Sequence, residues 1–228
     1  MKKSIAVLAA IVLLSGCKVD VVAKVNTDDL LSLDHKIVQG NINVEVPSCN
    51  DFEDSRKESK SLIQIKEKLP TIFKTVEFKE CYKQKFNSYA SFSVPVGIGS
   101  FVGEAKTVDT EIYVFSNKIT YAGIVLDDDA AKRLASAKKT SPGELNLAMT
   151  LVLEKGKQPI PNIAAIGVYM TGIESKNSPI SIGRVKIEAK EIKLRLSDVS
   201  NSMIESGKIT SVLVKAEYLE QLLTQLKE

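Results

Sequence analysis

The repeated alternation of apolar and polar residues is the strongest constraint on what this chain can fold into. Leu145, Leu147, Met149, Leu151 and Leu153 occupy every second position of one segment. A period of two places alternate side chains on opposite faces of a strand, so the segment is predicted to be a half-buried β-strand. Residues 42–46 follow the same pattern, and further strands are predicted at 72–82, 86–96, 107–115, 118–126, 160–171 and 180–196.

The apolar register shifts twice within residues 180–196. The apolar positions move from Ile180 and Ile182 to Val185, and then to Ile192. A one-residue shift turns the inward face outward, so a single long strand here needs a bend, for which Gly183 is a suitable place. Such a strand is typical of a strongly curved, cupped sheet.

Three segments show the spacing of amphipathic helices. The first is predicted to begin near Asp51 or Ser55 and to end at Pro70. The second, 127–139, begins with three Asp and ends with two Lys, which suits the helix dipole. The third, about 215–227, is expected to pack its apolar stripe on the sheet. That stripe consists of Tyr218, Leu219, Leu222, Leu223 and Leu226.

The N-terminal segment has the layout of a secretory signal. Lys2 and Lys3 precede an apolar run over 4–14, and small residues come just before Cys17. The run is well short of the roughly 20 residues that a membrane-spanning helix needs. A plain signal peptide with an incidental cysteine is the alternative.

Leu14-Ser15-Gly16-Cys17 resembles the lipobox of bacterial lipoproteins. The resemblance implies that residues 1–16 are a signal peptide, that Cys17 is lipidated, and that 17–228 form one lipid-anchored envelope domain. By similarity to enterobacterial lipoproteins, Lys18 after the cysteine favours the outer membrane, with the domain facing the periplasm. Because strand-like alternation starts at Val19, the domain is expected to lie close to the bilayer.

Cys49 and Cys81 are the two remaining cysteines. An exported protein meets an oxidising compartment, so the pair is predicted to form a disulfide. A metal site is the alternative, but the chain has one histidine, and two thiols with one imidazole do not complete a zinc shell. The expected fold class is therefore α+β, a curved and mainly antiparallel β-sheet with about three packed helices and one disulfide.

The charge balance argues against nucleic acid as a partner. Loss of Lys2 and Lys3 with the signal would lower the Lys and Arg count from 31 to 29, against 28 Asp and Glu. Phosphate binding needs a concentrated basic face, which such a balance does not supply.

Residues 97–103 are glycine-dense, and their third glycine falls one position late for a dinucleotide-binding loop. The simplest interpretation is a β-turn between strands. A sharper one is that Ile98, Phe101 and Val102 form an exposed apolar tip that contacts the membrane or a partner.

Sequence motifs for catalysis are missing from the chain. It has no G-x-S-x-G, H-E-x-x-H or Walker motif, and His35, its one histidine, is expected in an exposed loop. Asp127–Asp129 are interpreted as helix N-terminal residues, because the later ligands of a calcium loop do not follow them. A carboxylate pair for hydrolysis stays open, although the chain has no tryptophan for a sugar-binding cleft.

The expected function is therefore that of a non-enzymatic, lipid-anchored accessory or structural protein, with no catalytic residue, metal or cofactor. Its expected partners are the membrane, through the lipid anchor, and another envelope protein. The alternative is a periplasmic carrier of an apolar ligand or lipid, which would need an apolar interior cavity.

Overall fold

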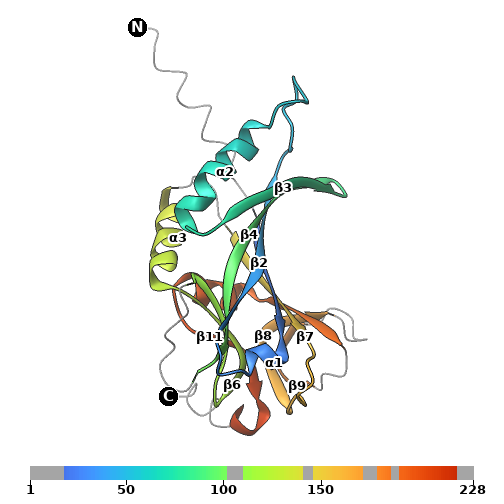
Figure 1. Ribbon diagram of the computed structural model, residues 1–228, viewed down its shortest axis with the longest axis vertical. Coiled ribbons are helices and arrows are strands. Elements are labelled where there is room, and N and C mark those ends of the chain that lie inside the picture. The colour runs from blue at the N-terminus through green and yellow to red at the C-terminus, as the bar shows by residue number, and fades with distance from the viewer. Residues whose placement is uncertain (1–17, 102–109, 141–145, 172–178, 186–189, 220–228) are drawn as a thin grey trace.

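A computed structural model gives the fold and describes residues 18–101, 110–140, 146–171, 179–185 and 190–219 (Figure 1). Eleven strands of this part of the chain belong to one sheet. They are β1 (Lys18–Asn26), β2 (Lys36–Val46), β3 (Glu77–Gln84), β4 (Asn87–Ser100), β5 (Ile112–Ser116), β6 (Thr120–Leu126), β7 (Asn146–Glu154), β8 (Ile163–Thr171), β9 (Pro179–Val185), β10 (Glu191–Leu196) and β11 (Thr210–Lys215).

The helical segments in the same part of the chain are α1 (Thr27–Leu30), α2 (Lys60–Ile72), α3 (Asp128–Thr140), α4 (Asp198–Glu205) and the 3₁₀ helix η3 (Ala216–Tyr218). None of the described helices is both long enough and apolar enough to cross a membrane. The predicted α+β class, with a large sheet, packed helices and one disulfide, is confirmed.

The sheet closes on itself through β8. Its strands follow the order β10-β7-β1-β2-β4-β5-β6-β11-β8, and β8 pairs in turn with β10. Neighbours are antiparallel except for β1–β7 and β4–β5. Because β9 runs along one edge of β8 from Ile163 to Tyr169, β11 and β10 share the other edge. β11 takes residues 163–165 of that edge and β10 takes 168–171.

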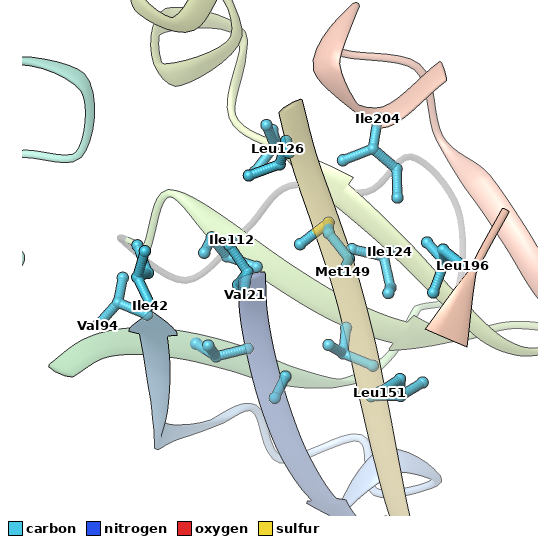
Figure 2. Close-up of a cluster of buried hydrophobic side chains, with 14 of the residues drawn as sticks. Val21, Ile42, Val94, Ile112, Ile124, Leu126, Met149, Leu151, Leu196 and Ile204 are labelled. Atoms are coloured by element: carbon cyan, nitrogen blue, oxygen red, sulfur yellow. The ribbon is translucent and has the colours of Figure 1, made fainter. Parts of the chain in front are cut away.

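Apolar side chains fill the interior of this ring (Figure 2). Alternate residues of several strands point inward, as in β1, where Val19, Val21 and Val25 are buried between more exposed neighbours. One continuous cluster contains inward-facing residues of β1, β2, β4, β5, β6, β7, β8, β10 and β11. The period-two pattern of the sequence therefore corresponds to burial inside the ring.

Helix α4 covers the place where β10 and β11 diverge along β8. Its N-cap Ser197 accepts a hydrogen bond from Ser200 N at 3.3 Å, and Ile204 is fully buried in the core. Ser200 Oγ donates to the carbonyl of Gly167 at 2.9 Å. Gly167 has φ +60°, and a Cβ there would lie 2.3 Å from Ser200 Oγ, so glycine is needed at this contact.

Helices α2 and α3 lie side by side outside the ring (Figure 1). The predicted α2 start was wrong, because Ser59 is the N-cap and accepts from Leu62 N at 3.2 Å. Asp51 instead stabilises a turn by accepting from Glu53 N at 2.9 Å. Pro70 lies inside the last helical turn and does not end the helix. Its buried residues are Leu62, Ile65, Leu69 and Ile72.

Other boundaries also differ from the sequence prediction. The strand predicted at 72–82 begins at Glu77, because Ile72 is the last residue of α2. Residues 180–196 do not form one bent strand: 179–185 form β9, which pairs with β8, and 191–196 form β10, which pairs with β7 and β8. The register shift thus marks a change of partner. At the C-terminal end, Lys215 belongs to β11 and η3 is a single 3₁₀ turn. Residues 220–227 of the predicted helix lie outside the described residues.

Candidate functional site

The predicted lipidation motif, Leu14 to Cys17, lies outside the described residues. The structure places its neighbour, because β1 begins at Lys18 and pairs in parallel with the start of β7, with Lys18 opposite Asn146.

The predicted disulfide between Cys49 and Cys81 is present, with a Cα–Cα distance of 5.6 Å. It joins the irregular segment between β2 and α2 to strand β3. The two cysteines are therefore committed to a structural bond, which excludes the alternative of a thiolate metal site. No cluster of three or more His, Cys, Asp or Glu side chains suited to a metal ion occurs among the described residues.

The described part of the glycine-dense segment, residues 97–101, forms neither a turn nor an exposed tip. Gly97 to Ser100 are the last residues of β4, and Ile98 is fully buried inside the ring. Phe101 is also buried, at 8% exposure. The prediction of an apolar contact tip is therefore wrong for Ile98 and Phe101, while Val102 lies outside the described residues.

Aromatic rings packed against the strands explain two of the glycines, Gly97 and Gly123. A Cβ on Gly97 would lie 2.3 Å from the Tyr113 ring, and one on Gly123 would lie 2.4 Å from the Phe115 ring. Phe101 stacks on both rings, with centroid distances of 5.1 Å to Tyr113 and 5.0 Å to Phe115. The three rings form a second, smaller core cluster beside the main one. Burial raises the pKa of the Tyr113 hydroxyl to about 12, so it stays protonated at neutral pH.

Gly97→Ala is expected to destabilise the protein, because the new methyl group overlaps the Tyr113 ring. Overpacking of this kind costs about 1–3 kcal/mol, or roughly 3–10 °C in melting temperature for a chain of this size. Thermal unfolding followed by circular dichroism measures the shift. Ser100→Ala in the same strand should stay within about 0.5 kcal/mol of the parent. A double variant with Tyr113→Ala should be less destabilised than the sum of the two single variants, and strict additivity would contradict this explanation.

His35 lies in an exposed loop, as predicted. Its Nε2 atom is 3.3 Å from the Ser100 carbonyl oxygen, and its ring is 5.7 Å from that of Tyr113. Asp127–Asp129 also behave as predicted: α3 begins at Asp128, and the Asp127 carboxylate accepts from Ala130 N at 3.4 Å. Both features are thus accounted for by local structure.

A surface groove of about 750 Å³ opens where the start of β7 and the end of β10 meet α4 and the end of α3. Its lining combines positive and negative side chains with apolar ones. Leu147 and Leu196 supply buried apolar surface, and Tyr169 is 38% exposed. The charged lining residues are Lys18, Lys138, Arg195, Asp198 and Glu205.

At this groove, two polar side chains of α4 accept hydrogen bonds from backbone N–H groups of β7 that do not pair with β10. β10 pairs with β7 only from Thr150 onward. Before that point, the Met149 N–H donates to Asn201 Oδ1 at 3.1 Å and the Leu147 N–H donates to Glu205 Oε1 at 3.3 Å. Lys138 at the end of α3 pairs with Glu205 at 2.6 Å. Asn201 and Glu205 therefore replace the missing strand and hold the groove walls together.

Lys18 and Arg195 are exposed at the groove, near the beginning of β1. Asp20 lies two residues along β1 and accepts from Thr150 Oγ1 at 3.2 Å. Burial raises the pKa of the Asp20 carboxyl, and the nearby Arg195 charge acts against this shift. The Arg195 side chain is exposed, so its guanidinium is accessible to a ligand in the groove.

Sequence reasoning missed the groove because its residues come from five separate segments of the chain. Single residues carried some signal: Ser197 and Gly207 bracket α4 as an N-cap and a left-handed C-terminal glycine. Nothing local, however, places α4 beside the first residues of β7. The juxtaposition arises from the closure of the ring.

Comparison with known proteins identifies the family of the chain. No curated protein and no solved structure matches it. A family model described as a domain of unknown function, DUF7424, matches residues 19–218. The match runs from the second residue of β1 to the last residue of η3, and so includes the lining residues of the groove except Lys18. The chain therefore belongs to the DUF7424 family.

Proposed function

We propose that this chain is a lipid-anchored accessory protein of the cell envelope, held at the outer membrane and facing the periplasm, which acts by binding another envelope protein and not by catalysis. The groove between β7, β10 and α4 carries the proposal. It is built on fixed secondary structure, and it includes Lys18, the residue that follows the lipobox cysteine. A partner bound there would lie beside the anchor.

The lining of the groove suits a polypeptide better than an acyl chain. Apolar surface from Leu147 and Leu196 lies next to the charged groups of Arg195 and Asp198. A peptide segment offers apolar side chains, polar backbone groups and charges to such a surface, whereas an acyl chain would leave the charged groups without partners.

The packing of the ring interior disfavours the alternative, an apolar-ligand carrier. A cavity large enough for an acyl chain would leave empty space beside the side chains that line it, and those side chains would be exposed to it. Instead, inward-facing residues of different strands, such as Ile42, Val94, Ile124 and Leu151, are 0–1% exposed (Figure 2). The described interior is thus occupied by the protein's own side chains.

Cys17→Ser tests the anchor. Cells that make the parent protein should incorporate radiolabelled palmitate into it, because the lipidated residue carries acyl chains. The variant should incorporate none and should leave the membrane fraction. Wild-type labelling of the Cys17→Ser protein would contradict lipidation at this residue.

A photo-crosslinking amino acid in place of Tyr169 tests the groove. On ultraviolet irradiation of intact cells, it is expected to join the chain to one discrete envelope protein. The same probe in place of Ile209, which is 54% exposed and outside the groove lining, should not give that product. Arg195→Glu should weaken the crosslink at least tenfold, while Arg56→Glu, in the distant β2–α2 segment, should not. Equal crosslinking in both arginine variants would contradict a role for the groove.

A further inference from the structure

The hairpin between β3 and β4 ends in an unusually exposed aromatic residue. Gln84 pairs with Asn87, so Lys85 and Phe86 form a two-residue turn. Phe86 is 96% exposed, and Lys85 has φ +56°, a conformation that residues other than glycine seldom adopt. A large apolar side chain displayed at a strained turn indicates a surface selected for contact and not for folding.

The outer half of the hairpin has the residue types of a membrane interface. Between Cys81 and Ala90 the charged residues are Lys83 and Lys85, with no acidic residue. Tyr82 and Tyr89 stack across the two strands with a centroid distance of 5.7 Å. Tyrosines at headgroup level, an apolar side chain beyond them and lysines that reach anionic headgroups are the features of interfacial anchoring.

The strand register places this tip toward the proposed anchor. Val19 of β1 pairs with Val44, Val44 pairs with Ala90, and Ala90 pairs with Cys81. One row across the sheet thus joins the start of β1 to the base of the hairpin tip. The three pairings are all antiparallel, so consecutive strands of the row run in opposite directions. A step from Val19 back to Lys18 in β1 therefore points toward the same edge of the row as the path from Cys81 to Phe86 in β3. At about 3.3 Å per residue and 4.8 Å per strand, the tip lies roughly 20 Å from Lys18.

The hairpin is also held firmly. β4 pairs with β2 along the whole of β2, and the Cys49–Cys81 bridge ties β3 to the β2–α2 segment. Figure 1 shows β3 at the same end of the molecule as α2 and that segment, away from β6 and β9. A second exposed aromatic residue of the segment, Phe52, is 88% exposed but lies between Asp51 and Glu53, which anionic headgroups repel.

We infer that the Lys85-Phe86 tip is a second membrane contact, which inserts Phe86 into an anionic bilayer surface beside the lipid on Cys17. The inference rests on the proposed anchor. Two contacts roughly 20 Å apart would fix the orientation of the domain on the membrane, which one flexible lipid attachment does not do.

The absence of tryptophan from the chain allows a direct test. Phe86→Trp introduces a single tryptophan at the tip, and Leu33→Trp introduces one beyond the opposite end of β1, where Leu33 is 69% exposed. Each full-length variant is lipidated in cells, purified and reconstituted into phosphatidylethanolamine–phosphatidylglycerol vesicles. Brominated acyl chains should quench the tip tryptophan and shift its emission to the blue, but should leave the Leu33→Trp variant unchanged.

The possible outcomes separate the anchor from the hairpin. If palmitate is incorporated but the Phe86→Trp variant is not quenched, the second contact is wrong and the anchor stands. If no palmitate is incorporated, the anchor fails, and the same quenching measured on added vesicles decides the hairpin by itself. In a Cys17→Ser background, Phe86→Ser should lower vesicle binding roughly tenfold. Phe52→Ser is the matched control and should change it less than twofold, and equal losses would overturn the inference.

Discussion

Removal of the Cys49–Cys81 bridge is expected to lower the free energy of unfolding by about 3–4 kcal/mol. The bridge joins residues 32 positions apart, and closing such a loop removes conformational entropy from the unfolded chain. For a chain of this size the loss corresponds to roughly 10 °C in melting temperature. The measurement is urea unfolding of Cys49→Ser/Cys81→Ser in a Cys17→Ser background, in which the parent retains only these two cysteines.

The loss of local stability should be greatest in β3, which pairs with only one strand, β4, among the described residues. Amide exchange is therefore expected to rise first in 77–84 and in the β2–α2 segment, while β7 stays protected. Parent protein treated with dithiothreitol is the control and should unfold at the same urea concentration as the double variant. An unchanged midpoint in both would show that the bridge contributes nothing to stability.

The elements that sequence reasoning predicted best are those whose signal is local. In β7 and β2 the alternation of side chains reflects one buried and one exposed face, and this follows from strand geometry alone. Helix α3 was predicted within one residue at each end, because its acidic start and basic end act within single helical turns. The disulfide followed from compartment and from an even number of remaining cysteines.

The errors occurred where a distant contact decides the local structure. A side chain at position 97 would overlap the Tyr113 ring, which belongs to another strand. No turn motif in residues 97–103 could therefore reveal why glycine occurs there. Residues 180–196 change partner between β9 and β10, and an apolar register shift does not say whether a strand bends or ends. Helix α4 had capping signals, yet it was missed because its sequence also resembles a polar loop.

The groove could not be predicted from the sequence for the same reason. Asn201 and Glu205 act on the backbone of Leu147 and Met149, more than 50 positions earlier in the chain. The hairpin tip could have been predicted as a turn from its spacing, but not as a neighbour of Lys18. That relation depends on the register of four strands.

Arg133→Met is expected to cost about 3–5 kcal/mol, the usual penalty for leaving one charge of a buried ion pair without its partner. Arg133 of α3 donates from Nε to the Ile72 carbonyl at 2.8 Å, and its Nη2 pairs with the Glu111 carboxylate. Glu111 is 8% exposed, and its other carboxylate oxygen accepts from Thr75 Oγ1 at 3.3 Å. These bonds fasten α2 and α3 to the start of β5, so their loss should loosen the helix layer as a unit.

Lys132→Met is the matched control at the neighbouring position. Lys132 pairs with Asp129 at 3.6 Å on the surface, where both side chains are at least 70% exposed, and such pairs contribute about 0–1 kcal/mol. Adding Glu111→Gln to Arg133→Met should restore part of the lost stability, because the buried site no longer holds an uncompensated carboxylate. Urea unfolding of the three variants measures these differences. If Arg133→Met costs no more than Lys132→Met, or if Glu111→Gln restores nothing, the helix layer is held by apolar packing and not by this ion pair.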